Sequence, residues 1–371
     1  MSYSLPYEPY YLFVSSPLDI SSGTIFGTIN ITDPSGNSLA QINSGPINGP
    51  DGLSIGPDGN LFVSQVLGGN VLKFNPATGD YLGTFTSDQQ IINGGLSGNA
   101  TLTGNVWGPD GNLYVSNFES KVGVDFVGAP IVNYDIQDSV LKINGKTGQV
   151  VQRIGIPAES PDINVTQSII EFPALVASRQ AQGLPYQGAF TKAALPIGLD
   201  FGKDGNLYAA NRIQSTVYQY NTQTQGIQPF ATYVSGLNGA AAQVQLPNGD
   251  WAVASLDGNE ILEYSSNGTF IKVLGNYNNT ALNGPTAMVL TPDKLSLIVS
   301  GYNSGSVVKL NAISGDIESV LINSTQYGGF RNDGILLVTP DQIGVSVPEP
   351  LNILGAFFVA MFGAFIKKKL K

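Results

Sequence analysis

The sequence has no cysteine and no histidine among its 371 residues. Without cysteine there is no disulfide, no thiolate nucleophile and no thiolate ligand for a metal. Without histidine there is no side chain whose unperturbed pKa lies near neutrality, which excludes histidine-based catalytic triads and the usual histidine-bearing zinc sites. Any catalysis would have to use carboxylates, tyrosine, lysine or a hard cation held by oxygen ligands.

Charge is also scarce, and basic charge most of all. Only 12% of the residues are charged, and 27 acidic residues stand against 17 basic ones. Four of the basic residues, Lys367, Lys368, Lys369 and Lys371, lie at the C-terminal end, so the rest of the chain is more acidic still. An acidic body of this kind repels nucleic acid and anionic lipid headgroups, so no nucleic-acid partner is expected.

What the sequence does contain is an internal repeat, in a chain with 45 Gly and 22 Pro. The phrases GPDGNLFVSQ, GPDGNLYVSN and GKDGNLYAAN begin at Gly56, Gly108 and Gly202. Around them, five nearly complete copies each contain four short apolar or alternating runs, which indicate strands. In the linking Asp-Gly-Asn turns, we expect Gly and Asn to take positive φ. Four antiparallel strands per repeat of about 40 to 50 residues are typical of a propeller blade.

The two ends of the chain supply a sixth blade. Residues 10–42 match the second, third and fourth strands of a repeat, and the run NDGILLVTPDQ from Asn332 matches the missing first strand. We therefore predict an all-β, six-bladed β-propeller over residues 1–346, closed by strands from both termini, because such closure removes the last exposed sheet edge. Residues 343–347 are a candidate for a second strand at the seam, so the pairing there stays open.

The repeats resemble those of the NHL-type six-bladed propellers and of the wider superfamily of streptogramin lyases and gluconolactonase-like lactonases. The resemblance covers roughly residues 10–345 and implies the fold. The lyases of this group use histidine, so the absence of histidine excludes that reaction here. The lactonases hold a divalent cation with Glu, Asn and Asp, but Glu8 lacks the following Gly-Pro, and the expected Pro-Asn-Gly reads Pro196-Ile197-Gly198.

A possible metal site emerges from aligning the residue seven positions before each turn Asp or Asn. The aligned positions are Asp51, Thr103, Ile197, Ala241, Thr286 and, at the seam, Asp333. Asp51 and Asp333 fall on adjacent blades, where two carboxylates could share Ca²⁺ or Mg²⁺ with help from the two threonines. The alternative is that both aspartates only cap turns.

Two insertions interrupt the repeats, at about residues 119–138 and 157–195. The longer one contains SIIEFPALVASRQAQGL, which could form a short helix broken at Pro173. Long loops on a rigid scaffold commonly carry specificity. The candidate ligand-binding residues of this loop are Asp162, Glu171, Arg179 and Tyr186, and the alternative is a loop that only covers one end of the ring.

The C-terminal residues 347–371 form a separate module. Pro348, Glu349 and Pro350 precede a largely apolar span, residues 351–366, and then Lys367, Lys368 and Lys369. This order resembles the PEP-CTERM sorting signal of Gram-negative bacteria, which implies a short transmembrane helix and an exosortase-type processing enzyme as partner. A helix of this span reaches only about 24 Å at 1.5 Å per residue, somewhat less than a bilayer core of about 30 Å. An ordinary C-terminal membrane anchor is the alternative.

Export would normally need a signal peptide, and MSYSLPYEPY has neither a basic n-region nor an apolar h-region. We expect that the leader is missing from this chain, because the first recognisable strand begins near Tyr10.

Three function classes follow from the sequence. The favoured one is an exported cell-surface or extracellular-matrix propeller that acts as a binding or structural protein, with a surface polysaccharide or protein as partner. A carbohydrate-binding module is a variant of it. The alternative is a divalent-metal-dependent hydrolase or lactonase of the gluconolactonase-like type.

Overall fold

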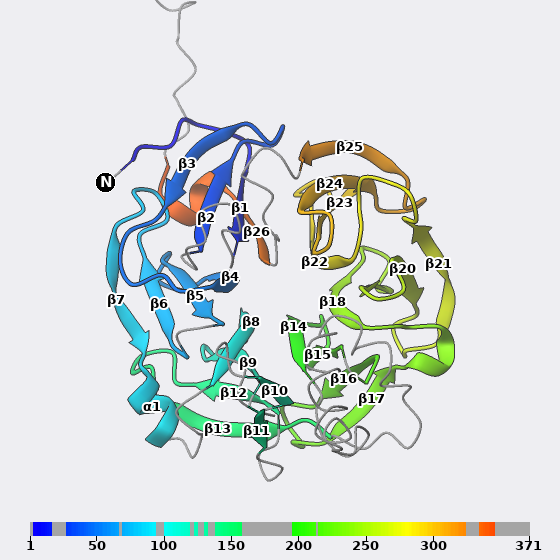
Figure 1. Cartoon of the computed structure of the whole chain (residues 1–371), viewed down its shortest axis with the longest axis horizontal. Helices are drawn as coiled ribbons and strands as arrows, with labels where there is room; N and C mark the ends of the chain where they lie inside the picture. The colour runs from blue at the N-terminus through cyan, green and yellow to red at the C-terminus, as the bar shows by residue number, and fades with distance from the viewer. Residues whose placement is uncertain are drawn as a thin grey trace, which may run out of the picture.

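The computed structural model describes residues 3–16, 27–66, 69–93, 100–118, 122–124, 130–132, 138–157, 195–212, 214–323 and 334–345. These residues form six four-stranded antiparallel sheets arranged around a central axis (Figure 1). The prediction of an all-β, six-bladed propeller is thereby confirmed.

Each blade uses its strands in the same order, from the axis outward. The innermost strands are β26 (Gly334–Val338), β4 (Pro50–Ile55), β8 (Thr101–Trp107), β14 (Pro196–Phe201), β18 (Ala240–Gln245) and β22 (Pro285–Leu290). The second strands are β1 (Tyr11–Ser16), β5 (Leu61–Gln65), β9 (Leu113–Phe118), β15 (Leu207–Asn211), β19 (Trp251–Ser255) and β23 (Ser296–Gly301). The third strands are β2 (Thr28–Thr32), β6 (Val71–Phe74), β12 (Ser139–Ile143), β16 (Thr216–Tyr220), β20 (Glu260–Tyr264) and β24 (Ser306–Asn311). The outermost strands are β3 (Ser38–Ile42), β7 (Tyr81–Thr86), β13 (Val150–Gly155), β17 (Ile227–Ala231), β21 (Phe270–Asn276) and β25 (Ile317–Ile322).

The ring closes through β26, which comes from the C-terminal part of the chain. It pairs antiparallel with β1, and the register runs from Tyr11↔Val338 to Ser15↔Gly334. The predicted closure by strands from both termini is therefore confirmed. The possible second strand at residues 343–347 is not formed as far as Val345, where the described residues end, because the chain turns into a 3₁₀-helix, η3 (Pro340–Ile343). Pro340 stands at the start of this helix, where its fixed φ fits and no N–H is needed.

The core of the propeller lies between the blades. The described residues form six buried apolar clusters, each shared by two neighbouring blades. Alternation along β1 explains this: Tyr11 and Phe13 enter the cluster with β5, whereas Leu12 and Val14 enter the cluster with β23. Second strands such as β5 and β19 are buried at every position because both of their faces are covered. Trp107 and Trp251 pack between blades, with ring centroids 4.9 Å from the Phe62 ring and 4.1 Å from the Tyr208 ring.

The hairpin turns between first and second strands depart in one respect from expectation. Gly59, Gly111 and Gly205 take left-handed φ values of 76°, 73° and 76°, as predicted. The Asn that follows each of them does not. In the second turn, for example, the backbone N–H of Asn112 donates to the carboxylate of Asp110 at 3.2 Å. The Asn is thus selected by its hydrogen bonds to Asp and not by its tolerance of positive φ.

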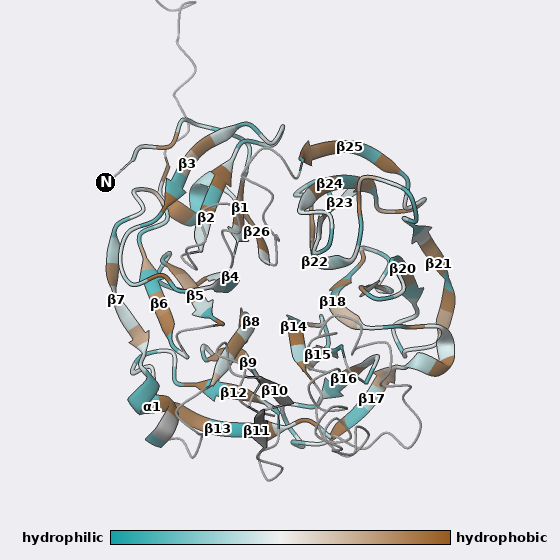
Figure 2. Ribbon diagram, viewed as in Figure 1, coloured by the Kyte–Doolittle hydropathy of each residue, from teal (hydrophilic) through white to brown (hydrophobic). Residues whose placement is uncertain are grey.

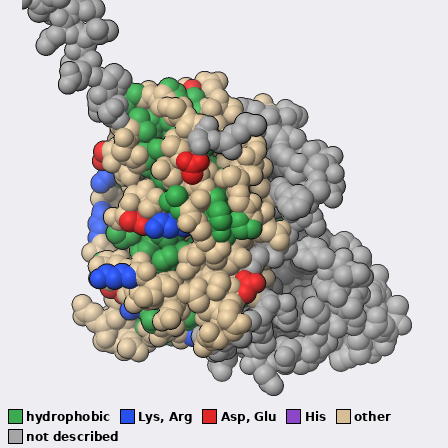
Figure 3. All heavy atoms as spheres, turned by 90° about the vertical axis from the view of Figure 1, so that its left-hand side faces the viewer, with side chains coloured by type: hydrophobic (Ala, Val, Ile, Leu, Met, Phe, Trp, Pro, Cys, Tyr) green, Lys and Arg blue, Asp and Glu red, His purple; other side chains and the backbone are tan. Residues whose placement is uncertain are grey.

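The outer wall is mixed in character. Hydrophobic and hydrophilic stretches share strands such as β13 and β21 (Figure 2). Figure 3 looks onto the wall at the left of Figure 1 and shows hydrophobic side chains interspersed with scattered charged ones. Exposed hydrophobic residues of the outermost strands include Leu82 of β7 and Val151 of β13, with exposed fractions of 50% and 54%.

Elements outside the blades are few in the described part of the chain. They are a short α-helix, α1 (Asp88–Asn93), a 3₁₀-turn, η2 (Tyr233–Ser235), and the paired strands β10 (Val122–Val124) and β11 (Pro130–Val132). The last two lie within the insertion at 119–138, where we expected only a lengthened loop. The larger insertion is outside the described residues from 158 to 194.

Candidate functional site

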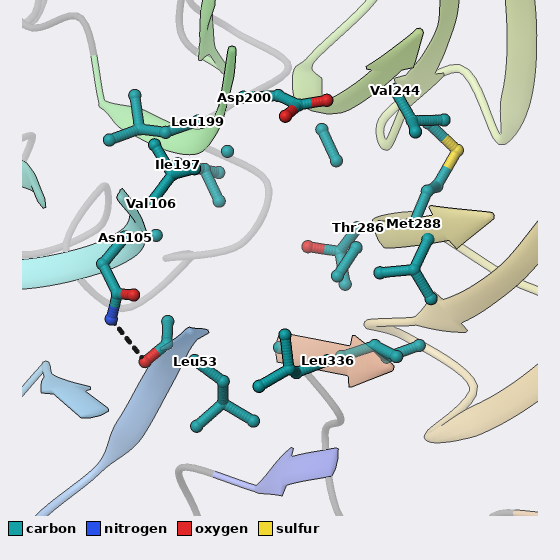
Figure 4. A pocket seen from close by; sticks show the side chains of 18 of the residues that line it. Leu53, Asn105, Val106, Ile197, Leu199, Asp200, Val244, Thr286, Met288 and Leu336 are labelled. Carbon is teal, nitrogen blue, oxygen red and sulfur yellow. Dashed lines mark hydrogen bonds between the residues drawn. The ribbon is translucent and has the colours of Figure 1, made fainter. Parts of the chain in front are cut away.

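The innermost strands surround a cavity on the axis of the ring. Its volume is ≈ 300 Å³, and residues of all six innermost strands line it. Figure 4 shows this cavity with Asn105, Thr286 and Asp200 on different sides of it. The cavity is large enough for a small organic ligand, and it is concave in the way that ligand sites usually are.

Local irregularity brings the innermost strands this close together. In five of the six, the pairing with the second strand shifts register, as between Pro196 and Leu199 in β14. Bulges of this kind re-aim side chains next to functional sites. Glycine permits the contact between neighbouring strands: a β-carbon at Gly104 would overlap the carbonyl oxygen of Ile197, and one at Gly198 would overlap that of Ala241. The backbone of the cavity wall is therefore closely packed between neighbouring blades.

Most of the wall is apolar. The apolar residues that line it include Leu53, Val106, Leu199, Val244, Met288 and Leu336. Val106, Val244 and Leu336 are only partly buried, since their side chains face the cavity as well as the core between blades. A wall of this composition offers favourable contact to the apolar body of a ligand.

Asp200 is the carboxylate that this wall surrounds. It lies near the end of β14, lines the cavity and is partly buried. One of its oxygens accepts a hydrogen bond from the backbone N–H of Phe201 at 2.8 Å. Among the described residues, no basic side chain forms an ion pair with it. Burial raises the pKa of Asp200 to about 7, because the charged form is poorly solvated and only the one hydrogen bond favours it.

Two buried amides belong to residues that line the same cavity. Asn105 of β8 uses its Nδ2 group to donate to the carbonyl of Gly52 at 2.8 Å and to the Ser64 hydroxyl at 3.1 Å. Gln243 of β18 uses its Nε2 group to donate to the carbonyl of Tyr208 at 2.9 Å. Within the described part of the chain, the Oδ1 atom of Asn105 and the Oε1 atom of Gln243 have no hydrogen-bond partner. Two residues of the cavity wall therefore hold buried acceptors without a hydrogen-bond partner in the described structure.

Of the two carboxylates in the predicted metal site, the structure places one. Asp51 lines the cavity at the start of β4 and is 7% exposed, and its carbonyl oxygen accepts a hydrogen bond from the Ser15 hydroxyl at 2.7 Å. Asp333 is outside the described residues, although Gly334, the next residue, packs against the backbone of Asp51. Within the described ranges, no three Asp or Glu side chains come together in a way that could hold a metal ion.

The two threonines predicted to assist that site have different surroundings. The Thr103 hydroxyl donates to the carbonyl of Pro196 at 2.8 Å, so it is committed to the contact between blades. Thr286 lines the cavity and is 3% exposed (Figure 4).

The other predicted site residues are not placed. The candidate loop residues Asp162, Glu171, Arg179 and Tyr186 lie beyond the described ranges, and so does the sorting motif Pro348, Glu349 and Pro350 with its lysines. No helix within the described ranges has the length and apolarity to cross a membrane, and the predicted span 351–366 is not among those ranges.

Sequence reasoning missed Asp200, although a signal for it exists. The residue four positions before each turn Asp or Asn is Ser54, Val106, Asp200, Val244 and Val289 in the five repeats. A single carboxylate in a column of small and apolar residues marks an unusual position. The prediction of Asp51 rests on a different column of the repeat, three residues earlier, which does not contain Asp200.

The turn aspartates have structural roles. Asp58 pairs with Lys73 at 2.6 Å and Asp110 pairs with Lys142 at 2.8 Å. The carboxylate of Asp204 accepts hydrogen bonds from the Asn206 amide and the Tyr208 hydroxyl. These contacts hold the hairpins at the outer end of the cavity wall and leave the aspartates outside the candidate site.

Comparison with known proteins identifies the fold and no family. No family model matches the chain, and no curated protein matches it. Among solved structures, a chain of a nidogen/laminin complex has 12% sequence identity and a TM-score of 0.55, with 89% of this chain and 98% of that chain covered. A protein of unknown function from Bacteroides caccae has 13% identity and a TM-score of 0.54, with 89% of this chain and 99% of that chain covered.

A lyase is also among the similar structures. A catalytically inactive virginiamycin B lyase from Staphylococcus aureus, solved with quinupristin, has 10% identity and a TM-score of 0.52, with 91% of this chain and 95% of that chain covered. Identities this low establish a shared architecture and nothing more about activity. The chain is a six-bladed β-propeller whose structural neighbours include propellers of the streptogramin-lyase type.

Proposed function

We propose that this chain is an exported cell-surface or extracellular-matrix propeller of a Gram-negative bacterium, that it acts as a binding protein, and that the central cavity is its ligand site. The observation that carries the binding role is the composition of the cavity. An apolar wall surrounds a few polar groups, Asn105, Asp200 and Thr286, on a backbone that is fixed before any ligand arrives. Preformed sites of this kind bind small molecules at low ordering cost.

The position of the long insertion indicates the face of the ring from which a ligand approaches the cavity. The chain leaves the ring at Pro157 and returns at Leu195, where the innermost strand β14 begins. Both ends are fastened: the carbonyl of Pro157 accepts from Gln214 at 2.7 Å, and the N–H of Leu195 donates to Asp138 at 2.9 Å. We propose that Asp162, Glu171, Arg179 and Tyr186 contact the ligand or a surface polysaccharide or protein from this side.

The proposed destination depends on the C-terminal sequence. Pro-Glu-Pro at 348–350, the apolar span 351–366 and the terminal lysines stand in the order of a PEP-CTERM signal. An exosortase-type enzyme would recognise this tail while the span holds the chain in the membrane. The acidic body fits a location away from nucleic acid.

The fold itself does not select between catalysis and binding. The similar solved propellers include a lyase and a chain of a protein–protein complex. A histidine-dependent lyase reaction is excluded for this chain, since it has no histidine.

A divalent-metal-dependent hydrolase or lactonase is the second candidate, and one observation favours it. A β-carbon at Gly334 would overlap the carbonyl oxygen of Asp51, so the residue after Asp333 lies against Asp51. The described residues alone do not complete a metal site there, because Thr103 is engaged elsewhere and no third carboxylate is near. Metal analysis of the purified protein tests this candidate: stoichiometric Ca²⁺ or Mg²⁺ that is lost in Asp51→Asn would replace the binding role with the hydrolase.

Native mass spectrometry of the propeller isolated from the surface of its host tests the proposed function. We expect a bound small molecule that is released on denaturation. Val244→Phe should abolish its binding, because the added ring occupies the cavity that Val244 lines. Val151→Phe is the matched control, since Val151 is 54% exposed on the outer wall. Equal ligand occupancy in both variants, or a propeller confined to the cytosol, would contradict the proposal.

A further inference from the structure

The polar side chains that line the cavity are two carboxylates, two amides and two hydroxyls, and none of them is basic. Asp200 of β14, the Oδ1 atom of Asn105 and the Oε1 atom of Gln243 come from three consecutive innermost strands. Asn105 and Gln243 are 8% and 4% exposed, so their free oxygens are buried as well as unpaired within the described structure. A buried acceptor without a partner is destabilising, and a ligand donor that reached it would offset that cost.

The orientation of both amides is fixed by their neighbours. An amide can be turned over so that its nitrogen and oxygen exchange places, and hydrogen-bond partners decide between the two positions. The carbonyl of Gly52 requires a donor from Asn105, and the carbonyls of Gly198 and Tyr208 require one from Gln243. The nitrogens are therefore committed to acceptors of the protein, and the oxygens are the atoms without a partner in the described structure.

The charge of the cavity points the same way. Asp51 and Asp200 are the titratable side chains among its lining residues, and no Lys or Arg is among them. Asp200 faces blade β18–β21, as its cross-strand neighbour Tyr208 packs on Trp251 of that blade. Gln243 faces back toward Asp200's blade, since it donates to Gly198 and Tyr208 there. Asp200 and Gln243 thus both lie at the interface of β14 and β18.

We propose that the cavity binds an organic ammonium ion, with Asp200 as its counter-charge and the apolar wall around the hydrocarbon body. This inference rests on the proposed function in that it takes the cavity to be a ligand site. A primary ammonium group supplies N–H donors and one positive charge, which match a cavity whose titratable lining residues are both carboxylates. The wall residues Val106, Val244 and Leu336 supply contact that a hydrated metal ion could not use.

The protonation of Asp200 adds a second, independent property to test. Because burial raises its pKa to about 7, the carboxylate is mostly neutral at pH 6 and mostly charged at pH 8. Of the strands packed around it, β8, β18, β22 and β26 carry no titratable residue, and β4 carries Asp51. Tyr208 of β15 and Tyr114 of β9 have raised pKa values through burial and stay neutral. An alkylammonium ion keeps its charge over this range, since its pKa is close to the 10.4 of lysine.

Calorimetric titration with hexylammonium chloride tests the proposal on the full chain. We expect binding that Asp200→Asn weakens by about tenfold or more, as loss of a charge-assisted hydrogen bond usually does. The substitution keeps the size of the side chain and an oxygen for the Phe201 N–H. Asp316→Asn is the control, since Asp316 is exposed on an outer turn and its loss changes the net charge equally. In the unsubstituted protein, affinity should rise about tenfold from pH 6 to pH 8 as Asp200 ionises.

Three comparison probes separate the outcomes. 1-Hexanol has the same chain without charge, hexyltrimethylammonium has the charge without N–H donors, and CaCl₂ has charge without an apolar body. The proposal predicts weaker binding for each. It is overturned by equal affinity of Asp200→Asn, by hexanol binding as tightly as hexylammonium, or by Ca²⁺ displacing hexylammonium through Asp200. It is overturned too if no probe binds.

The proposed function can survive such a failure. If the molecule released from host-derived protein in the native mass measurement is neutral, the cavity is still a ligand site and only the ammonium assignment is wrong. If no molecule is released and no probe binds, both are wrong.

Discussion

Truncation of the Val338 side chain tests how much the packing of the closing strand β26 contributes to the stability of the ring. It lies on β26, is fully buried and packs in the cluster that contains Tyr11 and Phe13. Val338→Ala removes two methyl groups, which costs about 1.6 kcal/mol at about 0.8 kcal/mol each. The cavity left behind adds about 1 kcal/mol, because neighbouring side chains on three strands cannot all relax into it. We expect the free energy of unfolding to fall by about 2–3 kcal/mol.

Urea unfolding followed by circular dichroism measures this loss. The midpoint should fall while the slope stays the same, which is the signature of lost stability without a change in the exposed surface. Val320→Ala on the outer strand β25 is the control, since Val320 is 46% exposed and the expected change is within about 0.5 kcal/mol.

A pair of truncations extends the test from one side chain to the whole strand. A chain that ends at Asn323 lacks β26, whereas one that ends at Val345 keeps β26 and η3. The shorter chain should lose more stability than Val338→Ala does, because β1 becomes an unpaired inner edge. Equal midpoints for the two truncated chains would refute the argument that β26 fastens the ring.

Further predictions concern other parts of the chain. Asp257→Asn should lower the free energy of unfolding by about 3 kcal/mol, because it leaves the Arg212 guanidinium, which Asp257 binds at 2.7 Å, buried without its counter-charge; an unchanged melting temperature would contradict this. Asp200→Asn should change the pH dependence of stability. Because the pKa of Asp200 is about 7 in the folded state, above its unfolded value, its stabilising contribution is full at low pH. That contribution is lost as pH rises toward 7, by up to about 1.4 kcal/mol per pH unit. The variant should lack this decline in urea titrations at pH 5 and pH 8. Alanine at all of positions 348–350 should leave the propeller folded and cause full-length protein to accumulate in the membrane. Normal release of the shortened protein would show that the processing enzyme does not recognise the motif.

Repetition made the architecture predictable from sequence. The Asp-Gly-Asn turns fixed the phase of the five copies, and NDGILLVTPDQ from Asn332 could be assigned to the incomplete first blade because it matched the missing strand. The 3₁₀-helix after β26 was not predicted. Its Thr339 and Gln342 form a reciprocal capping box. In the sequence this signal does not precede an apolar run, so it does not predict a helix.

The site was less accessible to sequence reasoning for a physical reason. Every innermost strand packs against its two neighbouring blades and also faces the axis. The sequence of such a strand is therefore typical of a buried core strand, whether or not a given residue lines the cavity. The bulge between Pro196 and Leu199 also changes which side chains face inward, and period-two counting does not include such a shift. Asp51 was identified because it is a carboxylate in the column seven residues before each turn, whereas Asp200 lies inside an apolar phrase, PIGLDF, that is typical of a buried strand.

A crystal structure of the propeller purified from the surface of its host tests the central claim most directly. The account predicts a small molecule on the ring axis, with a basic nitrogen within hydrogen-bond distance of the Asp200 carboxylate and its hydrocarbon part against Val244 and Leu336. A metal ion held by Asp51 and Asp333, or a ligand on the outer wall above a cavity that contains only water, would contradict it.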